Sequence, residues 1–150
     1  MVISDTEHTG TGQIGASVSI LYRHGTAHLS GELKRYGLGA GQHAILLIIS
    51  DTDGLRQEDL VRVLHVDKAH VARSVQKLLE LDYVRKEDDP TDQRARTLHA
   101  TEKARQIIPA IHSALEAWNN IVMIDMSPEE RDTLVKLLGR AASNAERNRA

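Results

Sequence analysis

Residues 55–101 read LRQEDLVRVLHVDKAHVARSVQKLLELDYVRKEDDPTDQRARTLHAT, and this stretch decides the fold. Apolar residues recur at helical spacing over 57–64, which predicts a short amphipathic helix. Its expected buried face carries Leu60, Val63 and Leu64. A tight turn is predicted at residues 65–67. Asp67 is a suitable N-cap, because its carboxylate can accept hydrogen bonds from the unpaired amides in the first turn of the next helix. A second helix is therefore predicted to begin at Lys68.

The second helix is predicted over residues 68–81, and its two faces differ in chemistry. One face is apolar and is expected to be buried: Val71, Val75, Leu78 and Leu79. The other is small, polar and cationic: Ala69, His70, Arg73, Ser74 and Lys77. Two short helices joined by a tight turn, the second with such an outer face, suit the major groove of DNA, which admits one helix. A solvated helix face with ordinary surface charges is the alternative.

A β-hairpin with a charged tip is predicted next. Residues 83–87 and 95–100 are strand-like runs, and residues 88–94 between them are rich in turn formers. A helix-turn-helix followed directly by a hairpin is a winged helix-turn-helix, in which the hairpin is the wing.

Two arginines of the hairpin, Arg94 and Arg96, lie where a wing can place a guanidinium in the narrow minor groove beside the second helix. Carboxylates facing the duplex would repel phosphate, so we expect at least one of Asp88, Asp89 and Asp92 to pair within the protein. Asp92 lies two residues before Arg94 and is the expected partner that braces the hairpin.

Three stretches of the chain resemble the MarR family of bacterial and archaeal transcription regulators. They are HVDKAHVARSVQKLLELDYV (65–84), DPTDQRARTLHATEKA (89–104) and LGAGQHAILLI (38–48). The wing signature is fairly specific: Asp-Pro, then Asp-x-Arg, an apolar strand and Thr-x-Lys. The resemblance runs from about Ile14 to the end of the last helix. It departs from the family pattern at Ala100 and Ala104, where the family commonly has Leu and Gly.

The resemblance implies a mainly α fold with a small β-wing, in which the winged helix-turn-helix is flanked by long dimerisation helices. It also implies a sequence-specific regulator of transcription that binds double-stranded DNA, as a repressor. Lys68 is expected to hold phosphate, and Ala69 to pack on a thymine methyl group. The residues expected to contact bases or phosphates are His70, Arg73, Ser74 and Lys77, and those expected in the wing are Asp92, Arg94 and Arg96.

The rest of the chain is predicted to complete one MarR-like domain over residues 13–150. Residues 1–12 are small and polar and are expected to be poorly ordered. Residues 38–100 are predicted to form the DNA-binding region, and residues 13–37 and 101–146 the dimerisation helices.

Local signals mark the ends of these flanking helices. Gly37 is expected to end the first helix in a left-handed conformation, and a second helix is predicted over residues 41–50. Thr101 is expected to cap the helix after the wing, which Pro109 should kink. Ser127–Glu130 predicts a capping box at the start of the last helix.

The flanking helices carry more apolar surface than a winged domain of roughly 60 residues can cover. Two copies that pair through these helices would bury it. A two-fold homodimer also suits the palindromic half-sites that helix-turn-helix readers bind. The alternative is a monomer whose flanking helices wrap the winged domain.

Composition excludes several classes of function. The chain has no cysteine, which removes disulfides, thiolate zinc sites and the thiol-based peroxide sensing known in the family. The scarcity of aromatic residues, at 3%, argues against single-stranded targets, which stack on aromatic rings. No catalytic motif, cofactor loop, signal peptide or membrane span is recognisable, so a cytoplasmic protein that is not an enzyme and needs no cofactor is expected. The net charge of −2 means that DNA binding depends on where the charges point.

Two other functions remain open for this chain. A zinc-responsive regulator could use some of the eight histidines, because His24 and His28 lie four apart and His43 and His112 could approach them. A winged helix can also serve only as a protein-interaction module.

The resemblance further implies a small aromatic carboxylate or phenolic effector, bound between the pairing helices and the winged domain. The residues expected to bind it are Arg23, His43, Tyr22 and Tyr36. Arg23 is the sharpest candidate, because guanidinium binds a carboxylate with two charge-assisted hydrogen bonds. A surface or intersubunit salt bridge is the alternative role of Arg23.

Overall fold

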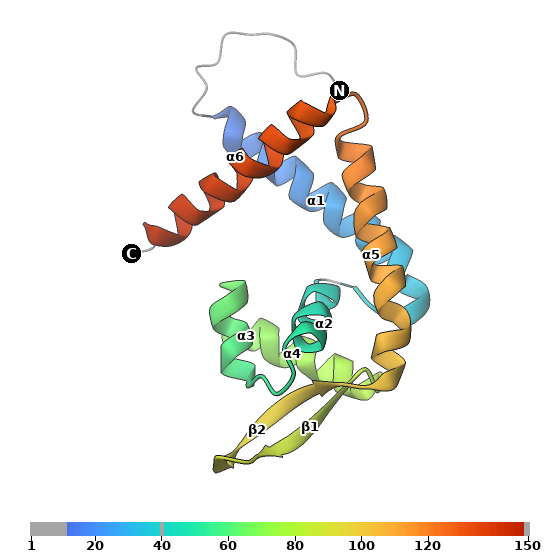
Figure 1. Cartoon of the computed structure of the whole chain (residues 1–150), viewed down its shortest axis with the longest axis vertical. Helices are drawn as coiled ribbons and strands as arrows, with labels where there is room; N and C mark the ends of the chain where they lie inside the picture. Colours follow the sequence, from blue (N-terminus) through green and yellow to red (C-terminus); the bar gives the residue numbers. More distant parts are fainter. Residues whose placement is uncertain (1–11, 40, 149–150) are drawn as a thin grey trace. The chain divides into compact units, whose positions relative to one another are not determined.

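The computed structural model describes residues 12–39 and 41–148, and it is mainly helical with one two-stranded antiparallel sheet (Figure 1). The predicted fold class is therefore confirmed. The expected poor order of residues 1–12 lies, Gly12 aside, outside the described residues. The elements in chain order are α1 Gln13–Leu33, the 3-10 helix η1 Lys34–Tyr36, α2 Gln42–Asp51, α3 Gln57–Leu64, α4 Lys68–Glu80, β1 Val84–Asp89, β2 Asp92–Ala100, α5 Glu102–Val122 and α6 Pro128–Arg147.

The helix ends lie where local chemistry predicts them. The Asp67 carboxylate accepts a hydrogen bond from the amide of His70 at 2.8 Å and so begins α4. The Thr101 hydroxyl accepts from the amide of Ala104 at 3.1 Å and begins α5. Gly37 ends η1 with φ +74°, a backbone conformation that glycine adopts without strain.

A single apolar core lies beneath α2, α3, α4 and the base of the hairpin. Its fully buried large side chains are Leu33, Ile45, Leu46, Ile49, Leu60, Val71, Val75, Leu78, Leu98 and Ile111. Ala100 and Ala104, where the chain departs from the family pattern, are buried too. Their small side chains therefore affect packing inside the core.

The prediction for the buried face of α3 was wrong at one position. Val63 is 56% exposed, whereas Leu60 is fully buried. Val61 and Leu64 are the partly buried neighbours that pack on the core. The buried face is thus rotated toward Val61, because α3 has only eight residues and meets the core along one narrow line.

The wing is longer, and its turn shorter, than predicted. Strand pairing runs from Val84 opposite Ala100 to Asp89 opposite Asp92, so only Pro90 and Thr91 lie between the strands. The predicted turn over 88–94 was wrong because backbone pairing does not need apolar side chains. Polar residues continue an exposed hairpin as long as the ladder bonds form.

The described chain divides into two compact units, the first ending at Leu115 and the second starting at Glu116. The boundary falls within α5, which continues as a helix through Pro109. In the second unit α6 begins with the predicted capping box, in which Ser127 accepts from the Glu130 amide at 3.2 Å. The assignment of 13–37 and 101–146 to dimerisation, within one domain over 13–150, stays a prediction.

Large apolar side chains are exposed on α1, on α6, at the end of α5 and in the turn after it when one chain is considered alone. They are Ile14, Val18, Ile20, Tyr22, Ile121, Ile124, Val135, Leu137 and Leu138. Within residues 12–39 and 41–148, the helices lack the combination of length and apolar character that a membrane span requires.

Candidate nucleic-acid interface

The outer face of α4 presents the cationic and small side chains that the sequence predicts. Lys68, Ala69, Arg73 and Lys77 are exposed, and His70 is half-buried. The helix is held from behind by Val71, Val75 and Leu78, which are fully or almost fully buried. It begins at a fixed point, because the amide of His70 donates to Asp67 and lowers the pKa of that carboxyl.

Ser74 does not belong to this outer face. Its side chain is 4% exposed, so the prediction of a DNA contact there was wrong. Successive helix residues are about 100° apart, so position 74 lies about 60° around the helix from Val71, at the edge of the buried side. The hydroxyl is small enough to be accommodated there.

The two arginines of the wing differ in their surroundings. Arg96 forms an ion pair with Asp88, the residue opposite it in the sheet. The amide of Arg94 donates to the Asp92 carboxylate at 3.0 Å, and the Arg94 side chain is exposed near the tip. Arg94 is thus the better placed of the two to reach a groove.

The most heavily bonded carboxylate of the hairpin is Asp89, whereas Asp92, the expected brace, accepts one hydrogen bond, from the Arg94 amide. The Asp89 side chain is only 8% exposed, and Arg56 Nη2 lies 2.7 Å from its Oδ2. Its Oδ1 accepts from the amide and the hydroxyl of Thr91, at 2.8 and 2.7 Å. Asp92 is 3.9 Å from Arg56, at the margin of this cluster.

Arg56 was not predicted, although the sequence contains a signal for it. It stands at the N-cap of α3, where Ser, Thr, Asp or Asn is preferred. An arginine cannot accept a hydrogen bond there, so its side chain is free for another use. The backbone amide of Arg56 donates to the Asp59 carboxylate at 2.8 Å. Its partner Asp89 lies 33 residues away, a distance that local pattern cannot bridge.

Asp89 should make the stability of the protein sensitive to acid. The bonds from Thr91 and then Arg56 lower the pKa of Asp89 to about 2, from its usual 3.8. A lowered native pKa stabilises the fold above pH 3.8, and that stabilisation is lost as the pH falls toward 2. The Asp89→Asn variant cannot titrate at this position. In urea unfolding, wild type should therefore have a higher free energy of unfolding than Asp89→Asn. This difference should be largest above about pH 5 and should shrink toward pH 3.

The matched control for Asp89→Asn is Asp132→Asn, which makes the same substitution at an exposed aspartate of α6. An Asp89→Asn difference that stayed constant from about pH 6 to 3 would contradict the role assigned to the charged pair.

A cavity of about 280 Å³ lies between α1, the start of α2 and the turn that joins α3 to α4. Its walls are mostly apolar and come from four helices: Tyr22 and Thr26 of α1, Ala44 and Ile45 of α2, Leu64 of α3 and His70 of α4. It therefore links the first flanking helix to the first turn of α4.

Of the four predicted effector residues, only Tyr22 lines this cavity. Arg23, the next residue on α1, is exposed and does not line the cavity. The backbone carbonyl of Tyr36 accepts from the Tyr83 hydroxyl at 2.9 Å, away from the cavity. Burial lowers the pKa of His43 below its usual 6.5, so its ring is a poor partner for an anion at neutral pH.

The histidines give no support to a metal site. Among the residues that the structure describes, no three His, Cys, Asp or Glu side chains come together in an arrangement able to hold a metal ion. His24, His28, His43 and His112 are included in that statement.

The chain is similar to known transcription regulators. Residues 36–95 match a family model described as MarR family. The HTH-type transcriptional regulator BilQ of Clostridioides difficile is 31% identical over 106 residues, which cover 71% of this chain and 72% of that protein.

Solved structures of similar fold are also known. The crystal structure of MarR superposes with a TM-score of 0.80 at 31% identity, over 89% of this chain and 98% of that one. A structure assigned to the MarR family from Listeria monocytogenes, complexed with 26mer DNA, gives a TM-score of 0.80 at 24% identity and covers 86% of each chain. At that identity the second likeness concerns the fold alone.

Proposed function

The chain belongs to the MarR family of transcriptional regulators, and on this premise we propose that it is a homodimeric repressor of two-fold symmetric DNA sites. The family comprises regulators with a DNA-binding winged helix and not enzymes. The proposed repressor reads each half-site with α4 in the major groove and Arg94 of the wing in the minor groove. It acts at the chromosome, so the cytoplasm is its proposed location.

The observation that carries this proposal is the outer face of α4. Lys68, Ala69, Arg73 and Lys77 are all exposed on it, while the rest of the helix is anchored in the core. A rigid helix with exposed arginine and lysine can read guanine edges and hold phosphates at the same time. The exposed Arg94 of the wing favours DNA over a partner protein as the target.

A selection of bound duplexes from a random pool tests the function. The expected product is a pair of inverted half-sites whose centres lie about 10 base pairs apart, or a multiple of that spacing. Recovery of no enriched sequence would refute sequence-specific binding. Enrichment of single half-sites would refute the symmetric dimer.

The proposed dimer rests on the apolar side chains that one chain leaves exposed on α1 and α6. Ile14 is 70% exposed and Val135 is 63% exposed, which is costly for a chain alone in water. Light scattering at micromolar concentration should therefore give twice the 16.6 kDa of one chain. A mass of one chain would exclude this pairing.

The proposed effector is a small aromatic carboxylate or phenol that occupies the cavity beside Tyr22. The volume of about 280 Å³ is close to the lower limit for ligand pockets, near 300 Å³, which suits a compound with a single ring. A ligand there touches both α1 and His70 of α4. It can lower DNA affinity only by its preference for one position of α4 over another.

Calorimetric titration of benzoate should separate two possible binding residues. Tyr22→Ala should weaken binding about tenfold through loss of an aromatic contact. Arg23→Ala changes the neighbouring residue outside the cavity and should leave the affinity unchanged. The reverse pattern would assign the carboxylate to Arg23. Binding without any change in operator affinity would dismiss release by a ligand.

A further inference from the structure

Four consecutive residues between α2 and α3 each contact the wing, and we call Asp53–Arg56 the wing clamp. Asp53 Oδ1 lies 2.8 Å from His99 Nδ1. The amide of Gly54 donates to the Leu98 carbonyl at 3.2 Å, and Leu55 accepts from the Leu98 amide at 2.7 Å. These first three contacts hold the base of the hairpin, at residues 98 and 99.

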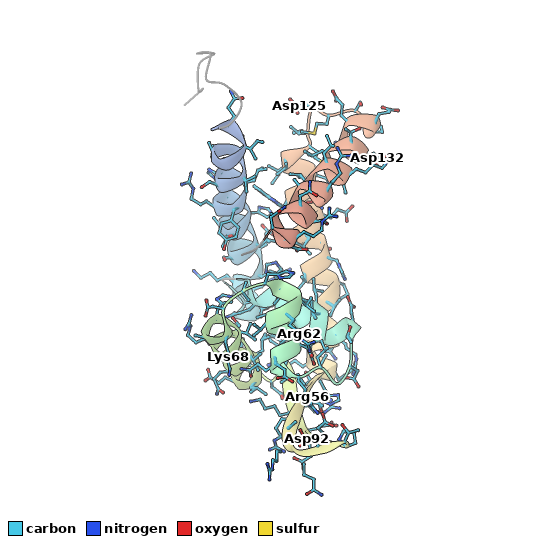
Figure 2. All side chains as sticks on the ribbon, turned by 90° about the vertical axis from the view of Figure 1, so that its left-hand side faces the viewer. Arg56, Arg62, Lys68, Asp92, Asp125 and Asp132 are labelled. Carbon is cyan, nitrogen blue, oxygen red and sulfur yellow. The ribbon has the colours of Figure 1, made fainter. Side chains whose placement is uncertain are left out.

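The fourth residue of the wing clamp reaches a different part of the hairpin. Arg56 Nε donates to Asp89 Oδ2 at 2.8 Å, and Arg56 Nη2 lies 2.7 Å from the same oxygen in an ion pair. Asp89 is the last residue before the two-residue turn. Figure 2 shows Arg56 beside Asp92 at the wing, whereas Arg62 lies farther along α3. The hairpin is therefore held at its base by three residues and at its tip by Arg56.

The contact at the tip is strong enough to fix it. Asp89 is largely shielded from water, and its three hydrogen bonds together with the Arg56 ion pair occupy both carboxylate oxygens. Charge-assisted hydrogen bonds in such surroundings are shorter and stronger than exposed ones. Removing Arg56 would leave a shielded carboxylate without its counter-charge, a costly arrangement that the tip can relieve by moving into water.

We propose that Arg56 is a wing-positioning residue: it sets where the wing tip lies, and so where Arg94 meets the minor groove, without touching DNA itself. This inference rests on the proposed function. Asp89 and Arg94 lie on opposite sides of the same short turn, so a shift of the tip displaces both.

The test compares two duplexes that contain the selected operator. The long duplex includes the flanking base pairs that the wing would reach, and the short one lacks them. Arg94→Ala and Arg56→Ala should each weaken binding to the long duplex about tenfold and to the short duplex less than about twofold. Because both act through the wing, the double variant should bind no more weakly than either single one. Arg56→Lys, which keeps the charge, should restore part of the affinity.

Two controls separate positioning from charge. Arg62→Ala removes the same charge from α3, but its partner Asp59 lies on the same helix. This variant should therefore still bind the long duplex more tightly than the short one, which is the advantage of the long duplex. Asp89→Asn removes a negative charge from the wing, and by charge alone should strengthen DNA binding. If Arg56 positions the wing, Asp89→Asn should instead reduce the advantage of the long duplex.

Amide hydrogen exchange tests the inference without DNA. The amides of Thr91 and Arg94 should exchange faster in Arg56→Ala than in wild type, and at the wild-type rate in Arg62→Ala. If wild type binds no duplex, the proposed function fails. If exchange at these two amides is unchanged in Arg56→Ala, the positioning role of Arg56 fails, whatever the DNA binding shows. If wild type binds but Arg56→Ala keeps the advantage of the long duplex, or is additive with Arg94→Ala, only the inference fails.

Discussion

Arg73→Ala should bind the selected operator with a free energy about 1–3 kcal/mol less favourable, which is roughly a 5- to 150-fold loss of affinity. Arg73 is exposed at the middle of the outer face of α4, one helical turn from Ala69 and from Lys77. A guanidinium there can donate two hydrogen bonds to the O6 and N7 atoms of a guanine. The variant should therefore also lose discrimination at one base pair of each half-site.

Competition binding against operators substituted at each position measures both effects. Lys68→Ala is the comparison, because Lys68 stands at the start of the same helix and is proposed to hold phosphate. It should weaken all sequences about equally and lower the slope of log affinity against log salt by about 1. If Arg73→Ala behaved in the same way, Arg73 would be a phosphate contact and its proposed reading role would be lost.

Leu60→Ala should reduce the free energy of unfolding by about 2–5 kcal/mol. Leu60 is the fully buried residue of α3, so its substitution by alanine leaves a cavity in the core. Val63→Ala, on the same helix, shortens a side chain that is 56% exposed and should cost less than about 0.5 kcal/mol.

Urea unfolding at one fixed protein concentration compares the two variants, because the stability of a dimer depends on concentration. Equal losses for Leu60→Ala and Val63→Ala would mean that α3 packs with the face that the sequence predicts and not with the face described above.

The sequence alone was sufficient for the features that depend on neighbouring residues. The cap of α4 at Asp67, the cap of α5 at Thr101 and the left-handed Gly37 were all predicted correctly. Each involves groups only a few residues apart, so its chemistry is complete within the local stretch. The fold class followed, because two capped helices and a hairpin in this order leave few ways to bury their apolar faces.

Tertiary structure decided the features that depend on distant partners. Ser74 lies at the border of the predicted outer face, and what packs against α4 determined that it is buried. The length of the turn at Pro90 followed from the pairing register of two strands. The bond between Arg56 and Asp89 joins groups 33 residues apart, which helical or strand periodicity cannot relate. Each of these features depends on contacts that exist only after the chain has folded, so no local pattern in the sequence contains them.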